Sequence, residues 1–160
     1  MLIQNQTFNA PSAKQGHLQE LIDIVLDKQQ KGVKVRVIFR SFGGKTRENL
    51  EALKDIGFDM SAIRTHPHCH TKGIIVDKRR ILLGSHNLSE SGVSVNRDAS
   101  LLFDDAPLAA YFRELFEYDW QWMSDSKIGE EIAGLRLIGP DESTPPGFER
   151  VPPDEYLEWL

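Results

Sequence analysis

The sequence predicts an α/β fold, a layered α/β/α sandwich built around a mixed central sheet. Apolar, β-branched segments alternate along the chain with segments whose apolar residues recur at helical spacing. In addition, two short apolar runs at 73–76 and 81–84 flank the charged tetrapeptide 77–80, which indicates a β-hairpin. The alternation favours parallel strands and the hairpin adds antiparallel ones, so the sheet should be mixed.

The first half of the chain is expected to hold three strands and two helices. One helix should begin near Leu18 and stop at Gly32, because Gly readily ends a helix. A second helix, over 46–56, should turn Leu50, Leu53 and Ile56 toward the core. The strands are predicted over 2–8, 33–39 and 62–65, with Val33, Val35 and Val37 on one face of the middle strand.

The second half is expected to continue the sheet and to end in a helix and a tail. After the hairpin, 88–92 reads as a polar loop and 93–103 as a strand. A helix over 107–123 should bury one stripe, and the catalytic half-domain should end at residue 125. Residues 126–160 are acidic and rich in proline, which predicts an extended C-terminal tail. The predicted helical stripe consists of Leu108, Phe112, Leu115, Phe116 and Trp120.

Composition excludes several classes of protein. The chain has 160 residues, of which 40% are hydrophobic and 27% charged, as in a globular domain. No run approaches the roughly 20 apolar residues of a spanning helix, so no integral membrane segment is expected. Cys69 is the single cysteine, which rules out an internal disulfide. We therefore expect a cytoplasmic protein, with peripheral association with a membrane as an alternative.

The hairpin should gather four polar side chains into one patch. If Lys78 and Arg79 form a two-residue turn, Lys72 faces Ser85 and His70 faces Asn87. Residues that lie directly opposite each other, or two apart on one strand, share a face of the sheet. The predicted patch therefore consists of His70, Lys72, Ser85 and Asn87.

These four residue types suit an anionic, oxygen-rich centre such as a phosphodiester. Histidine can act as a nucleophile or as an acid or base near neutral pH, lysine supplies a positive charge, and Ser and Asn are neutral donors. An attacking His70 also needs an orienting acceptor. Asp77 is too far along the same strand, about 23 Å at 3.3 Å per residue. Asp98, on the next predicted strand, can return to the patch and is the expected partner.

Two other interpretations of this region carry less weight. His66, His68, Cys69 and His70 are close in sequence, but a fourth ligand at zinc spacing is missing and alternate side chains diverge. We therefore expect no metal and no other cofactor, with Cys69 in the core. The patch could also be a purely structural polar end of the sheet, although grouped Lys and His side chains are costly there without a function.

The spacing of the patch resembles a known signature. His-x-Lys, four residues, Asp, six residues and Gly-Ser-x-Asn, running from His70 to Asn87, resembles the HKD motif of the phospholipase D superfamily at every defined position. The opening IQNQ, the KGVKVRVIF strand and the NRDASLLFDD segment also resemble one catalytic half of that family, over about 1–125. They are most similar to the C-terminal half of bacterial phospholipase D-like and cardiolipin synthase-like enzymes.

The resemblance implies a metal-independent phosphodiesterase with a covalent phosphohistidine. By position, His70 would attack phosphorus, and Lys72 and Asn87 would hold the non-bridging oxygens with support from Ser85. Asp98 stands where family members carry the carboxylate that orients the histidine. The motif positions Asp77 and Gly84 would have structural roles.

The chain departs from the family in holding a single motif, whereas the family's active site needs two. The second HKD motif would come from an identical chain or from an N-terminal half, and the resemblance favours the N-terminal half. A phospholipid is the favoured substrate, with hydrolysis and phosphatidyl transfer both open. The alternatives are a dimeric endonuclease of the same superfamily, acting on nucleic acid, and a non-catalytic binding or scaffold half-domain.

Overall fold

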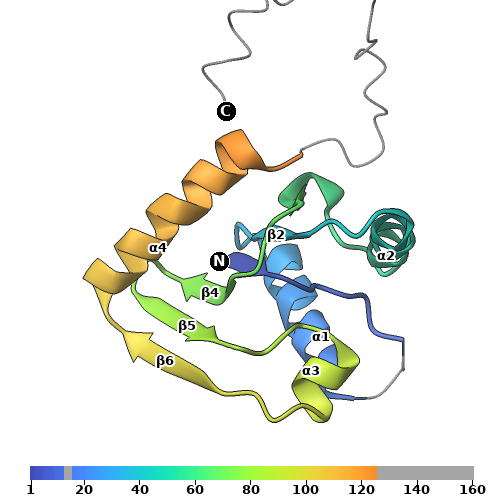
Figure 1. Ribbon diagram of the computed structural model, residues 1–160, viewed down its shortest axis with the longest axis horizontal. Coiled ribbons are helices and arrows are strands. Elements are labelled where there is room, and N and C mark those ends of the chain that lie inside the picture. The colour runs from blue at the N-terminus through green and yellow to red at the C-terminus, as the bar shows by residue number, and fades with distance from the viewer. Residues whose placement is uncertain (13–15, 126–160) are drawn as a thin grey trace, which may run out of the picture. The chain divides into compact units, whose positions relative to one another are not determined.

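The protein folds around a six-stranded mixed sheet (Figure 1), in a computed structural model that describes residues 1–12 and 16–125. The predicted tail at 126–160 therefore lies outside the described residues. The predicted α/β class and the mixed sheet are confirmed. The strands are β1 (Leu2–Asn5), β2 (Arg36–Arg40), β3 (Ile63–His66), β4 (Lys72–Val76), β5 (Arg80–Gly84) and β6 (Ser100–Asp104).

The strand order is β3-β2-β1-β4-β5-β6. The first three strands run parallel to one another, and β4, β5 and β6 add antiparallel pairs. Strands β1, β2, β3 and β5 therefore finish at the same end of the sheet, where β4 and β6 begin. We call this the carboxyl end of the sheet. The helices are α1 (His17–Gln30), α2 (Gly44–Asp55), α3 (Glu90–Ser94) and α4 (Ala106–Tyr118), with short helical turns at Met60–Ala62 and Asp119–Met123.

Helices pack on both faces of the sheet, which confirms the predicted three layers. Leu18 and Ile22 of α1 and Leu53 of α2 are fully buried in the larger core, because their spacing puts them on one side of each helix. On the opposite face, α4 packs Ala109 against the strands of the hairpin, and Phe116 is only 1% exposed. From the strands, Ile3, Val37, Phe39 and Ile63 face α1 and α2, and Ile38, Ile75 and Ile81 face α4.

The helix ends follow the chemistry of their sequences. Helix α1 is followed by Gly32, whose φ of 81° suits glycine best. Helix α4 begins after Asp105, whose carboxylate accepts a hydrogen bond from the Leu108 amide at 2.9 Å, and Pro107 fits in its first turn. These signals account for the helix boundaries near the predicted positions.

Three strand predictions were too long. β1 ends at Asn5, and Phe8 makes only an isolated bridge to Leu88. β2 begins at Arg36 because its first partner on β1 is Leu2. Val33 lies before that pairing and is 39% exposed. The predicted strand over 93–103 is a strand only from Ser100 onward.

The loop predicted over 88–92 was also wrong, because helix α3 begins there. Ser89 caps it by accepting a hydrogen bond from the Gly92 amide at 3.2 Å. Two residues predicted to face the core are instead exposed: Ile56, at 40%, and Leu115, at 46%. Ile56 follows the last residue of α2, and Leu115 lies on the outer side of α4.

The hairpin forms, but its predicted turn and register were wrong. Asp77 and Lys78, not Lys78 and Arg79, are the central turn residues, with φ of 54° and 56°. The Arg79 amide donates to the Val76 carbonyl at 3.2 Å. Three residues therefore separate β4 from β5, and each residue of β4 pairs one position earlier on β5 than predicted.

Cys69 lies in the core beside Ile38 and Phe116 and is 3% exposed, as predicted. Burial raises the pKa of its thiol to about 11, and the charge of Asp119 acts in the same direction. The thiol should therefore stay protonated in the folded protein at neutral pH.

We expect Cys69 to react with a thiol reagent roughly 100-fold or more slowly in the folded protein than in urea, because the thiolate is the reactive form. The measurement is the rate of disulfide exchange with DTNB at pH 8, with Cys69→Ala as the blank. Equal rates with and without urea would contradict the buried position.

Candidate active site

All five predicted catalytic and phosphate-binding residues lie at the carboxyl end of the sheet. His70 is exposed two residues before Lys72, the first residue of β4. Ser85 and Asn87 follow the end of β5, and Asp98 precedes the start of β6. Three chain segments that meet at one end of the sheet thus carry the predicted site.

Lys72 is held in place by two hydrogen bonds. Its ammonium donates to the Gln6 side-chain oxygen at 2.8 Å and to the His70 carbonyl at 2.9 Å. Burial lowers the pKa of Lys72, and the negative charge of Asp98 acts against this shift. The positive charge of Lys72 is therefore fixed beside His70 and within electrostatic range of Asp98.

Gly84 and Ser85 tie the end of β5 to the segment that contains Asp98. The Ser85 hydroxyl accepts a hydrogen bond from the Ala99 amide at 3.1 Å, and the Ser85 amide donates to the Ala99 carbonyl at 3.0 Å. A Cβ atom on Gly84 would lie 2.0 Å from the Ser100 hydroxyl, so only glycine fits there. Ser85 therefore positions the residue next to Asp98 in the described structure.

Asn87 has an unusual polar environment. Its side-chain oxygen is buried, and within residues 1–12 and 16–125 it has no hydrogen-bond partner. A buried polar atom left without a partner costs about 1–3 kcal/mol. A Cβ atom on Gly92 would lie 2.2 Å from the Asn87 carbonyl oxygen, so helix α3 packs closely against this residue. Asn87 is thus packed closely at this end of the sheet, with a buried side-chain oxygen that has no partner among the described residues.

Some predicted neighbours do not face each other. In the observed register, Lys72 lies opposite Gly84 rather than Ser85, because the turn contains one more residue than expected. In the described part of the chain, the His70 ring makes no hydrogen bond with Asp98 or with another side chain. The orienting role of Asp98 and the roles of the other site residues stay predictions.

Asn5 and Gln6 are site residues that the analysis of the sequence missed. The Asn5 amide donates to the His86 carbonyl at 3.0 Å, and its oxygen accepts from the Thr7 and Leu88 amides at 3.1 and 3.4 Å. Asn5 thereby fixes the backbone on both sides of Asn87, and Gln6 holds Lys72. Their signal in the sequence is a run of three polar residues, Gln4 to Gln6, that starts within β1 and continues past its end.

Removing the charge of Asp98 should change the pH dependence of any activity that needs protonated Lys72. In Asp98→Asn the pKa of Lys72 should fall further, since burial would act without the opposing carboxylate. Lysine is charged below its pKa, so the loss of activity at alkaline pH should begin at lower pH than in the wild type. A pH profile of kcat/KM tests this.

Asp104→Asn is the matched control, because Asp104 lies at the other end of β6 and pairs with Arg79 and Arg80. It should leave the alkaline limb unchanged. An unmoved limb in Asp98→Asn would show that Asp98 does not influence Lys72.

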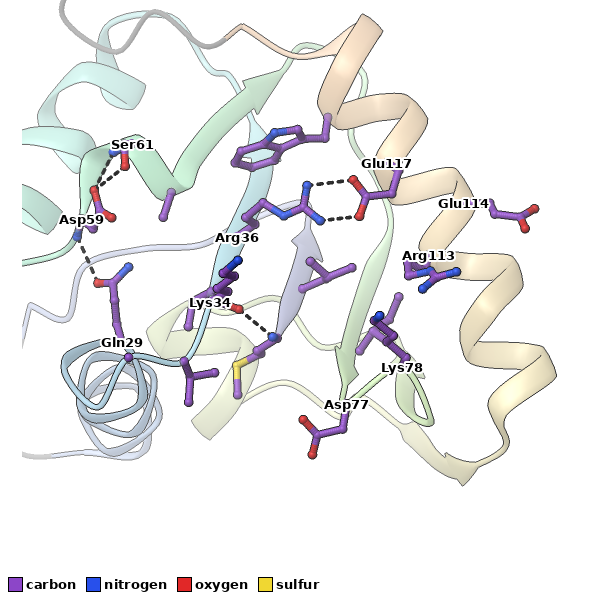
Figure 2. A pocket seen from close by; sticks show the side chains of 18 residues that line it. Gln29, Lys34, Arg36, Asp59, Ser61, Asp77, Lys78, Arg113, Glu114 and Glu117 are labelled. Atoms are coloured by element: carbon purple, nitrogen blue, oxygen red, sulfur yellow. Dashed lines mark hydrogen bonds and ion pairs between the residues drawn. The ribbon is translucent and has the colours of Figure 1, made fainter.

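A broad hollow of about 1140 Å³ lies at the opposite end of the sheet, beside the hairpin turn (Figure 2). Arg36 and Glu117 form a two-pronged ion pair on its wall, and Arg36 lowers the pKa of Glu117. Charges of both signs line the hollow, and no histidine or cysteine is among the described residues that line it. The hollow is therefore separate from the predicted site.

The histidines near Cys69 do not form a metal site. The His66 Nδ1 atom accepts a hydrogen bond from the His68 amide at 2.9 Å, and Cys69 faces the core. Within the described ranges, no group of three His, Cys, Asp or Glu side chains is arranged to hold a metal ion.

The mixed sheet and the polar cluster at its carboxyl end define a phospholipase D-like domain. The family described as "Cardiolipin synthase, PLD-like domain" matches residues 3–120. The chain therefore belongs to the phospholipase D-like phosphodiesterase superfamily, and the predicted family is confirmed.

Individual relatives agree with this assignment. The chain is 29% identical over 102 residues to the mitochondrial cardiolipin hydrolase of Chlamydomonas reinhardtii, covering 63% of this chain and 46% of the relative. It is 31% identical over 99 residues to the phospholipase D of Rickettsia prowazekii, covering 58% and 46%. The chain thus spans about half the length of these relatives.

A solved structure supports the fold alone. The phospholipase D family member Nuc from Salmonella typhimurium superimposes with a TM-score of 0.59 at 22% identity, covering 77% of this chain and 80% of Nuc. No helix within the described ranges combines the length and the apolar character needed to cross a membrane. The cytoplasmic location stays a prediction, since some relatives are named as mitochondrial.

Proposed function

We propose that this chain is one catalytic half of a metal-independent, phospholipase D-type phosphodiesterase. The observation that carries the proposal is the placement of Lys72, whose ammonium is fixed at the His70 carbonyl and within electrostatic range of Asp98. A fixed cation next to a histidine supports attack on phosphorus, because it stabilises the negative charge that collects on the phosphate oxygens.

In the proposed first step, a ring nitrogen of His70 attacks phosphorus and the bond from phosphorus to the leaving oxygen breaks. The leaving alkoxide takes a proton from a second histidine, and a phosphohistidine remains on His70. Lys72 and Asn87 hold the non-bridging oxygens. The contacts of Ser85 with Ala99 support this arrangement by keeping Asp98 near the site.

In the second step, water or an alcohol attacks phosphorus and the bond to the His70 nitrogen breaks. The second histidine, now neutral, accepts the proton of the attacking group. Water gives hydrolysis and a lipid alcohol gives phosphatidyl transfer. The chain has one His-x-Lys motif, so the second histidine has to come from a second copy or from an N-terminal half.

Phospholipid is the proposed substrate class. The relatives named cardiolipin hydrolase and phospholipase D support this choice, and the formal net charge of −5 gives no overall attraction to nucleic acid. A dimeric endonuclease of the same superfamily remains the alternative, and both substrates belong in one experiment.

The test is a side-by-side assay of the full chain with cardiolipin-containing vesicles and with plasmid DNA, each with and without EDTA. We expect release of phosphatidic acid or a transfer product from the vesicles, unchanged by EDTA. Cleavage of DNA alone would favour the endonuclease, and inhibition by EDTA would contradict a metal-independent reaction. Inactivity on both substrates would contradict a site completed by a second copy of this chain and would favour the N-terminal half as the source of the second motif.

A further inference from the structure

Strand β6 forms one border of the sheet, and its outer side is uncovered by any described residue (Figure 1). Its sequence is Ser-Leu-Leu-Phe-Asp, and Leu101 and Leu102 are 65% and 70% exposed. Adjacent strand residues point to opposite faces, so this border is apolar on both faces of the sheet. Exposed apolar edges can pair with other strands, and proteins usually protect them with charges or proline.

The hydrogen bonds between β5 and β6 show which backbone groups are free. Ser85 donates to Ala99 at 3.0 Å, and Asp105 donates to Arg79 at 2.9 Å. Hydrogen-bonded and non-hydrogen-bonded residue pairs alternate in an antiparallel ladder. The backbone amide and carbonyl groups of the odd-numbered residues of β6 therefore point toward β5. The amide and carbonyl groups of Ser100, Leu102 and Asp104 therefore point away from the sheet, toward the open border.

We propose that β6 pairs with β6 of a second copy of this chain, antiparallel and about a two-fold axis through Leu102. This axis places Leu102 opposite Leu102 of the second copy, Leu101 opposite Phe103 and Ser100 opposite Asp104. The residues with outward backbone groups then meet one another, as a hydrogen-bonded ladder requires. The Leu102 pair lies on one face of the joined sheet and the Leu101–Phe103 pairs lie on the other. Both are contacts between apolar side chains, which stabilise paired strands.

The charges at this border are compatible with self-pairing. Asp104 is the acidic residue of β6, and its carboxylate contacts Arg79 and Arg80 of its own chain. In the proposed register Asp104 faces the neutral Ser100, so no like charges lie opposite each other. Pairing with a second copy therefore brings no repulsion between like charges at this border.

The proposed contact is distinct from the pairing that would complete the catalytic site. The Ser100 end of β6 adjoins Gly84 at the carboxyl end of the sheet, and Asp104 lies at the other end. Antiparallel pairing therefore puts the two His70 regions at opposite ends of the joined strands. The contact cannot supply the second histidine, and it does not depend on the proposed function.

Cross-linking tests the register directly. In a Cys69→Ala background, Leu102→Cys should form a disulfide-linked dimer on mild oxidation. The Cα atoms of opposite residues in a hydrogen-bonded pair lie about 5.5 Å apart, within the Cα–Cα range of disulfides. Leu101→Cys is the matched control. Leu101 and Leu101 of the second copy are diagonal neighbours in this register. Their separation of about 7–8 Å lies beyond the Cα–Cα range of disulfides. We expect at least roughly tenfold slower cross-linking for Leu101→Cys, and equal rates would overturn the register.

Sedimentation of the full chain tests the association itself. Pairing of one short strand buries less than a stable interface of at least about 1,200 Å², so we expect a Kd of about 10 µM to 1 mM. Leu102→Lys should weaken association at least about tenfold by placing two lysines opposite each other. Val95→Lys, also at an exposed apolar residue, should not. A monomer at all concentrations, or equal association in both variants, would overturn the proposal.

Discussion

His70→Asn should lose phosphodiesterase activity by roughly 10³-fold or more while the fold and the melting temperature stay unchanged. Asparagine has a similar reach but cannot form the covalent phosphorus bond or exchange a proton near neutral pH. His70 is exposed, and no hydrogen bond of its ring to another described side chain would be lost. The measurement is turnover of a chromogenic phosphodiester together with thermal unfolding.

His68→Asn is the control for this variant, because His68 is also an exposed histidine and lies two residues away. It should retain most of the activity. Full activity in His70→Asn would eliminate the histidine mechanism. Loss of activity with a lowered melting temperature would instead indicate a structural role for His70.

Mixing the inactive variant with wild-type chains shows where the second histidine comes from. If two copies share one site, a refolded equal mixture should retain about one quarter of the activity, since only wild-type pairs work. If each chain works alone or with another domain, the mixture should retain about one half. The specific activity of mixtures refolded together distinguishes these outcomes.

The layered fold was predictable because its signals are local and redundant. The apolar residues Leu18 and Ile22 mark the buried face of α1, and Leu53 marks that of α2. The end of α1 near Gly32 follows from the ability of glycine to adopt a positive φ. Strand lengths were not predictable in the same way. β2 begins only where Leu2 offers a partner to Arg36, and pairing of this kind depends on tertiary structure.

The position of the candidate site was predictable, but its internal contacts were not. The motif spacing placed His70, Lys72 and Asn87 at one end of the sheet. The register depends on the positive φ angles of Asp77 and Lys78. Neither residue is glycine, so the charged tetrapeptide 77–80 indicated a turn without showing which two residues form its centre. The supporting contact from Gln6 to Lys72 joins residues 66 positions apart, which no local pattern indicates.

Asn5→Ala should lower both stability and activity, because Asn5 connects β1 to the backbone around Asn87. The Asn5 side chain is 3% exposed and makes hydrogen bonds with His86, Thr7 and Leu88. Alanine would remove the printed partner of the His86 carbonyl and of the Thr7 amide, whereas the Leu88 amide keeps its hydrogen bond to the Thr7 carbonyl. The loss of these two partners should lower the free energy of unfolding by about 2–4 kcal/mol. Asn87 should also lose its fixed position, so we expect kcat/KM to fall roughly 10- to 100-fold at temperatures where the protein is folded.

Asn49→Ala separates the loss of stability from the loss of positioning. Asn49 makes two comparable hydrogen bonds, with the Ala10 amide and the Phe8 carbonyl, both at 2.8 Å, and makes no hydrogen bond with the described 86–88 segment. Urea unfolding should show a comparable loss of stability in both variants, whereas kcat/KM should fall only in Asn5→Ala. If both variants lose activity in proportion to stability, Asn5 supports the fold rather than the site. If Asn5→Ala alone loses activity, the end of β1 belongs to the catalytic architecture, because Asn5 sets the position of the segment around Asn87 relative to Lys72.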